Sequence, residues 1–74
     1  MSYQFNLTKF AIAIKLKRQM LGFSIRELSE LTGLSSATIS RMEQDENAPD
    51  IATFAKLCDW LGFEPNDFFV RRDE

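Results

Sequence analysis

The chain has 74 residues, which is enough for one small domain but not two, and its 45% apolar and 27% charged residues exclude a disordered chain. One cysteine and no histidine exclude an internal disulfide, the common metal sites and histidine-based acid–base catalysis. Six of the nine basic residues lie in residues 1–42 and nine of the eleven acidic ones in residues 43–74, so the first half can face phosphate despite a net charge of −2.

The first predicted element follows a short N-terminal leader, residues 1–6. The leader is not a secretory signal, and no run approaches the roughly 20 apolar residues of a membrane span, so we expect a cytoplasmic protein without a membrane partner. Apolar residues at helical spacing predict a helix over residues 7–21, ended by Gly22, with a core-facing side formed by Leu7, Phe10, Ala11, Ile14 and Leu21. A second apolar row on this helix consists of Ile12, Leu16 and Met20. We expect it to be covered by Tyr3 and Phe5 or by a second subunit.

Two short helices separated by a tight corner are predicted next. Ser24 and Glu27 form a capping-box pattern that starts a helix over residues 24–32, whose apolar side contains Ile25, Leu28 and Leu31. Gly33 ends this helix, because glycine adopts the left-handed conformation that a sharp turn needs. Ser35 then caps a helix over residues 35–43. The connection between the two helices is therefore too short for anything except a tight helix-turn-helix corner.

The outward side of the third helix is almost bare. In "GLSSATISRME", residues 33–43, Leu34, Ile39 and Met42 can hold the helix on a core, whereas the residues between them are small except for Arg41. A B-form major groove about 12 Å wide admits a helix only if its outward side chains do not collide with the base edges. Small polar side chains meet this condition, so the pattern predicts that this face enters a DNA groove.

An acidic loop, "QDENAPD", leads to a fourth helix over residues 50–61 that Gly62 ends. Its broad apolar side contains Ile51, Phe54, Ala55, Leu57, Cys58 and Leu61. Because Cys58 lies among apolar residues, we expect a buried thiol rather than a nucleophile, and no enzymatic activity. Pro65 suits the first turn of a short fifth helix, and no segment is a strand candidate. The sequence therefore predicts an all-α fold, with residues 71–74 as a solvated tail.

The segment "SIRELSELTGLSSATISRMEQDENAP" resembles the helix-turn-helix of the Cro and phage-repressor family, also known as Xre-like. The matching positions are Leu28, Ser29, Gly33, Leu34, Ser35, Ile39, Met42, Glu43 and Pro49. The resemblance extends over residues 14–69, which is most of the chain. It implies a compact five-helix, lambda-repressor-like DNA-binding domain over residues 7–70, with no catalytic group, metal, cofactor or small-molecule ligand.

The resemblance also implies which residues read the DNA bases. The family's base-reading positions correspond to Ser36, Ala37 and Arg41, and Ser40 also lies near the bases. By its chemistry, Arg41 can bind O6 and N7 of a guanine, although a phosphate contact or an exposed charge is the alternative. Ala37 can pack on a thymine methyl group, and Ser36 can accept or donate a hydrogen bond.

Two further groups of residues complete the expected site. The resemblance implies a partly buried ion pair between Arg18 and Glu43, which fixes the first helix against the third. The candidates for phosphate contacts are Ser24 and Ile25 at the start of the second helix, together with Lys17, Thr38 and Gln44.

Several positions depart from the family pattern. Ile25 stands where the family often has a phosphate-binding glutamine, and Asp45 stands where it usually has glycine. Glu46, Asn47 and Ala48 occupy positions where basic residues are frequent. We therefore expect a weaker hold on the DNA backbone and a shallower dependence of binding on salt, which makes binding of two copies together more necessary.

The family commonly binds near-palindromic sites as two-fold dimers, with half-sites about 34 Å apart. Large apolar residues after the fourth helix point to an interface there. Phe63 and Phe68 match core positions of the family, so we expect both to be buried. The interface candidates are Trp60, Pro65, Asn66, Asp67, Phe69 and Val70.

The expected function is that of a transcriptional regulator, with repression as the expected mode. It would bind a near-palindromic operator in double-stranded DNA as a homodimer, through the helix over residues 35–43. The alternative is a protein-interaction or antitoxin module that uses the same fold and contacts a protein partner through the row Ile12, Leu16 and Met20.

Overall fold

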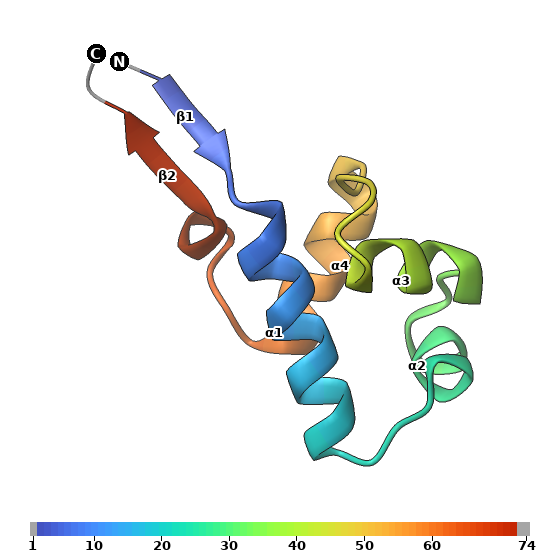
Figure 1. Cartoon of the computed structure of the whole chain (residues 1–74). Helices are drawn as coiled ribbons and strands as arrows, with labels where there is room; N and C mark the ends of the chain where they lie inside the picture. Colours follow the sequence, from blue (N-terminus) through green and yellow to red (C-terminus); the bar gives the residue numbers. More distant parts are fainter. Residues whose placement is uncertain (1, 73–74) are drawn as a thin grey trace.

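The helices of the molecule begin and end close to the predicted positions. We describe residues 2–72 in a computed structural model of the chain (Figure 1). The structure contains α1 (Leu7–Met20), α2 (Ile25–Thr32), α3 (Ser36–Glu43) and α4 (Ile51–Leu61). A 3₁₀-helix, η1 (Pro65–Phe68), and two short strands, β1 (Ser2–Phe5) and β2 (Phe69–Arg72), complete it. No helix within these residues is both long enough and apolar enough to cross a membrane.

Polar side chains fix where the helices start. The Ser24 hydroxyl accepts a hydrogen bond from the Glu27 amide, and the Glu27 carboxylate accepts one from the Ser24 amide, so the predicted capping box is confirmed. Ser35 and Asp50 cap α3 and α4 by accepting a hydrogen bond from the Thr38 and the Thr53 amide, without a reciprocal bond. Asn6 caps α1 by accepting a hydrogen bond from the Lys9 amide at 3.0 Å, a cap that was not predicted.

Gly33 forms the corner between α2 and α3 in the left-handed conformation, with φ at 77°. A Cβ added there would meet no atom within 4 Å, so the cost of a side chain lies in the backbone alone. We therefore expect Gly33→Ala to lower the free energy of unfolding by about 1 kcal/mol. Urea denaturation checks this, with Gly33→Asn as the control because asparagine tolerates this conformation better. Equal stability of the alanine variant and the wild type would contradict a left-handed corner.

One core holds the helices together. Its fully buried large side chains are Phe10, Phe68, Ile14, Leu28, Ile39, Met42 and Leu57. Cys58, at 4% exposure, is buried as predicted, and this burial raises the pKa of its thiol. These residues come from α1, α2, α3, α4 and η1, so the core fixes how α2 and α3 are presented to the outside.

Five residues that the apolar pattern assigned to the core are exposed instead. The prediction was wrong for Leu21, Leu31, Ile51, Ala55 and Phe63. The reason is geometric, because a helix in so small a domain contacts its neighbours along one narrow side, and residues at the edge of a broad apolar arc remain in solvent. Phe63 is 46% exposed and covers the core only by stacking on Phe68, with ring centroids 5.7 Å apart.

The predicted helical fold is confirmed, but the count of five helices and the lack of strands were wrong, because residues 2–5 and 69–72 form a two-stranded antiparallel sheet. Ser2 lies opposite Arg72 and Phe5 opposite Phe69, and the ribbon projects beyond α1 (Figure 1). The predicted fifth helix is reduced to the single 3₁₀ turn of η1, since Phe69 already has an extended backbone and starts β2. β1 alternates polar and aromatic residues over only four positions, the minimum for a strand pattern, and β2 does not alternate at all, so the pairing could not be recognised in the sequence.

An aromatic cluster anchors this ribbon to the helices. The Phe5 ring lies 5.4 Å from Phe54 and 5.3 Å from Phe69, between centroids, and also contacts Phe10. Arg72 Nε donates to Gln4 Oε1 across the strands, so Arg71 and Arg72 lie in β2, where a solvated tail was expected. Met1, Asp73 and Glu74, the outer ends of the expected leader and tail, lie outside the described residues.

Candidate nucleic-acid interface

The corner between α2 and α3 is held by a local network of hydrogen bonds. The Ser29 hydroxyl donates to the Leu34 carbonyl at 2.5 Å, and the Leu34 amide donates to the Thr32 hydroxyl at 3.3 Å. Ile39 and Met42 are buried on the inner side of α3. These hydrogen bonds and the buried side chains together fix the direction in which the outward side of α3 points.

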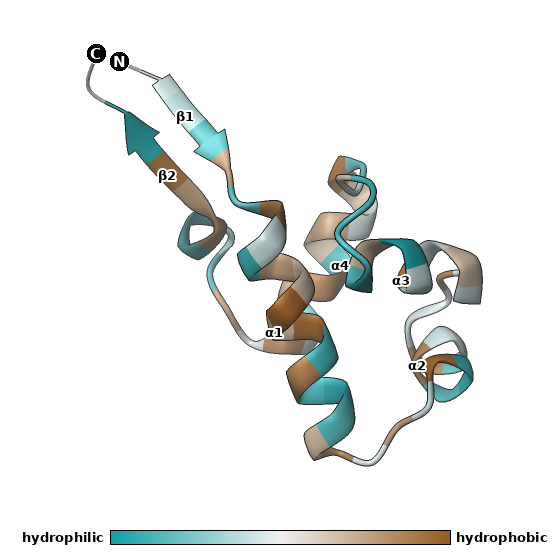
Figure 2. Ribbon diagram, viewed as in Figure 1, coloured by the Kyte–Doolittle hydropathy of each residue, from teal (hydrophilic) through white to brown (hydrophobic). Residues whose placement is uncertain are grey.

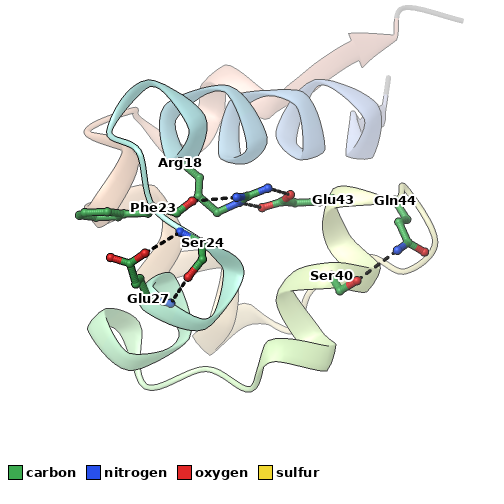
Figure 3. Close-up of polar contacts among 7 residues, drawn as sticks. All are labelled: Arg18, Phe23, Ser24, Glu27, Ser40, Glu43 and Gln44. Atoms are coloured by element: carbon green, nitrogen blue, oxygen red, sulfur yellow. Dashed lines mark hydrogen bonds and ion pairs between the residues drawn. The ribbon is translucent and has the colours of Figure 1, made fainter.

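That outward side carries the candidate base-reading residues. Ser36, Ala37 and Arg41 are exposed, while Ser40 is half-buried and accepts a hydrogen bond from Gln44 Nε2 at 3.1 Å (Figure 3). The Arg41 side chain makes no hydrogen bond or ion pair with any other residue between 2 and 72. Its guanidinium is therefore a cation without a structural partner in the described part of the chain, on a helix side that is otherwise composed of small residues.

A shallow hollow of about 190 Å³ borders Arg41 on the side of α4. Its walls are formed by Thr38, Arg41, Met42, Asn47, Ala48, Pro49, Asp50 and Thr53. Asp50 stays ionised at neutral pH, because the hydrogen bond from the Thr53 amide holds the pKa of its carboxyl below the ordinary value. This negative charge disfavours a phosphate in the hollow.

The Arg18–Glu43 pair joins the end of α1 to the end of α3. Arg18 Nε donates to Glu43 Oε2 at 2.7 Å, and Arg18 Nη2 donates to Glu43 Oε1 at 2.8 Å (Figure 3). Arg18 Nη1 also donates to the Phe23 carbonyl at 2.8 Å, in the segment before α2. The two side chains are only 13% and 5% exposed, and the hydrogen bonds to Glu43 raise the pKa of Arg18. The pair therefore fixes α3 to α1 and to the segment before α2.

The candidate phosphate contacts are not gathered in one place. Ser24 has both its amide and its hydroxyl engaged with Glu27, whose negative charge lies beside the start of α2. The Ile25 side chain packs against the core, which leaves only its backbone amide for a phosphate. The Thr38 hydroxyl accepts a hydrogen bond from the Ser35 hydroxyl at 2.7 Å, and Lys17 contacts α4. Thr38 and Gln44 are therefore the members of this group that lie on α3 or directly after it.

The segment after α3 contains a contact that was not predicted. Asp45, at the position where the family usually has glycine, is the only non-glycine residue among the described ones with positive φ, at 62°. Its carboxylate accepts a hydrogen bond from the Thr8 hydroxyl of α1 at 2.7 Å. The glycine that the family usually has at this position was the available signal for this conformation, because glycine marks a left-handed backbone position, which aspartate also tolerates. Figure 2 shows the hydrophilic character of this connection between α3 and α4.

The predicted dimer residues lie in two different settings. Trp60 is half-buried and packs against the core, and Lys17 Nζ lies 5.0 Å from the centroid of its ring. Pro65, Asn66 and Asp67 are exposed on η1. Phe69 and Val70 belong to β2 and are 39% and 46% exposed. The exposed apolar surface near the C-terminus is thus on the ribbon rather than on a helix.

Comparisons with known proteins agree on one family. The helix-turn-helix family model matches residues 14–68. The HTH-type transcriptional regulator PuuR of Escherichia coli strain K12 is 42% identical over 52 residues, which are 70% of this chain and 28% of PuuR. Antitoxin HipB of the same strain is 37% identical over 63 residues, 82% of this chain and 72% of HipB.

A solved structure shows the same arrangement of helices. The restriction-modification controller protein C.AhdI from Aeromonas hydrophila superimposes with a TM-score of 0.69 at 26% identity. The match covers 84% of this chain and 94% of the controller protein. The chain therefore spans most of C.AhdI and of HipB, but only 28% of the length of PuuR.

Proposed function

This chain belongs to the helix-turn-helix family, and on that premise we propose that it is a transcriptional regulator that binds double-stranded DNA sequence-specifically. The observation that carries the proposal is the outward side of α3, where small exposed residues surround an arginine without a partner in the described chain. A helix of this shape fits the major groove, and an unpaired guanidinium there has acceptors within reach on guanine.

The proposed base contacts follow from side-chain chemistry. Arg41 donates two hydrogen bonds to O6 and N7 of a guanine, and Ala37 packs on a thymine methyl group. Ser36 accepts or donates at a third base. Ser40 contributes less, because its hydroxyl is already bonded to Gln44.

The proposed phosphate contacts are fewer than is usual for such a domain. Thr38 and Gln44 contact the DNA backbone beside α3. At the start of α2 the Ile25 amide contacts it, together with the Ser24 hydroxyl, which accepts a hydrogen bond from Glu27 but can still donate one. Lys17 joins them only if its ammonium leaves the Trp60 carbonyl. The acidic segment after α3 adds no cation, so the electrostatic part of the affinity is small.

We also propose that two copies bind one near-palindromic operator as a homodimer. Phe69, Val70 and the exposed residues of η1 support an interface near the C-terminus, because they are apolar or lie next to apolar surface. A dimer that occupies an operator keeps other proteins off that DNA, which makes repression the proposed outcome. No cofactor takes part in this mechanism.

Salt dependence tests the proposal of DNA binding. We expect the affinity for a labelled random-sequence duplex, followed by fluorescence anisotropy, to fall with salt on a double-logarithmic slope smaller in magnitude than about 5. Few neutralised phosphates produce such a slope. Arg41→Asp should abolish binding, while Lys56→Gln on α4 serves as the matched control. Absence of binding even at low salt would contradict the proposal.

A further inference from the structure

The outer side of α1 carries an uncovered apolar row. Ile12 and Leu16 are each 54% exposed and Met20 is 85% exposed, and their spacing of four residues aligns them along one side of the helix. Neither of the two residues expected to cover them does so, because Tyr3 is itself 72% exposed and Phe5 packs on Phe54 and Phe69. The row lies opposite Phe10 and Ile14, the residues that bury the inner side of α1.

A groove runs beside this row. It has a volume of about 370 Å³ and is lined by Ala13, Lys17, Met20, Leu21, Leu61 and Phe63. Leu21 is 51% exposed and Phe63 is 46% exposed, so the floor of the groove is apolar and open to solvent. A ridge of apolar side chains next to an apolar groove is the surface on which an amphipathic helix can lay its own apolar row.

The charges that α1 itself carries have one sign, although the Asp45 carboxylate lies against Thr8, one turn before Ile12. Helix α1 contains Lys9, Lys15, Lys17 and Arg18 and no acidic residue, and within the described part of the chain only Arg18 pairs with a carboxylate. Lys9 donates to the Asp67 carbonyl at 2.7 Å and Lys17 donates to the Trp60 carbonyl, and neither lysine forms an ion pair within residues 2–72. Lys15 is exposed and has no partner among residues 2–72. On α1 the apolar row is therefore flanked by lysines that form no ion pair with a described residue.

This charge pattern indicates which kind of partner the surface binds. Symmetric pairing of α1 with α1 of a second copy would bring lysines together without any acid on either helix to offset them, which is unfavourable. We propose that the row and the groove dock an amphipathic helix of another protein, with acidic residues beside its apolar row. The acids of that helix pair with Lys15 and with Lys9 or Lys17, and its apolar residues fill the groove above Phe63. The site shares no residue with the outward side of α3, and Lys17 is the one residue that it has in common with the proposed phosphate contacts.

A designed peptide tests the proposal without knowledge of the natural partner. The probe is a synthetic helical peptide of about 20 residues with leucine at every third or fourth position and glutamate on both flanks. The control peptide has lysine in place of every glutamate. We expect the acidic peptide to bind the ¹⁵N-labelled protein and to shift the amide signals of α1 and of the segment around Phe63, and the lysine peptide to leave them unchanged.

Matched variants localise the binding. Leu16→Gln should weaken the acidic peptide about tenfold, whereas Leu31→Gln, at a leucine of similar exposure on α2, should not. Lys15→Glu should weaken it about threefold, and Arg41→Asp should have no effect. Equal binding of both peptides, binding of neither, or shifts confined to α3 would overturn the proposal. Binding of α1 to anionic phospholipid vesicles in place of the acidic peptide would overturn it as well.

Discussion

Replacing Glu43 with leucine is expected to lower the free energy of unfolding by about 3 kcal/mol, because the Arg18 guanidinium then stays in a largely buried place without its carboxylate. Arg18 would keep only its hydrogen bond to the Phe23 carbonyl. The loss should also misorient α3, since the pair joins α1 to the end of that helix. Urea denaturation followed by circular dichroism measures the change in stability.

The control for this prediction is the double variant Arg18→Met, Glu43→Leu. Removing both charges avoids an unpaired buried ion, so we expect the double variant to recover most of the lost stability. A Glu43→Leu variant as stable as the wild type would show that the pair is solvated and contributes little. A double variant whose loss equals the sum of the two single losses would show that the two residues act independently.

Arg41→Ala is expected to weaken binding to the preferred operator at least about 30-fold, since each copy loses a bidentate contact worth about 1–3 kcal/mol. Stability should not change, because Arg41 is exposed and has no partner in the described chain. Discrimination should disappear at one symmetric pair of base positions and persist elsewhere. Competition with operators substituted at single positions measures this, with Lys56→Ala as the control.

A different outcome would change the role of Arg41. A loss that is uniform over all operator sequences, together with a salt slope reduced by about 1 per lost contact, would identify a phosphate contact. No loss on any sequence would contradict a role of this residue in DNA binding. In that case the outward side of α3 would have to be reconsidered as a whole.

The helix boundaries could be predicted because they depend on local chemistry. Ser24, Ser35 and Asp50 cap helices through bonds to an amide three residues away, and Gly33 and Gly62 end helices in the left-handed conformation. All of these interactions lie within a few residues of each other, so the sequence alone contains them. The inward positions Leu28, Ile39 and Met42 were likewise predicted and are buried.

The ribbon could not be predicted because its cause is not local. β1 and β2 join the two ends of the chain, and each is extended because Phe5 and Phe69 pack against Phe54 of α4. The exposure of Leu31 and Ile51 also depends on which neighbours the helices meet. For the site, the family pattern indicated that Arg18 pairs with Glu43. The contacts of Lys17 with Trp60 could not be predicted, because they depend on how α1 packs against α4.

Selection of binding sites from a pool of random duplex DNA by the purified wild-type protein, at moderate salt, tests sequence reading by α3 most directly. We expect enrichment of a near-palindrome whose half-sites are about 10 base pairs apart, the spacing of two α3 helices on one face of the duplex. A guanine required at one symmetric position would match Arg41. Failure to enrich any sequence, at moderate or at low salt, would contradict the proposed function and leave the docking surface on α1 as the remaining candidate site.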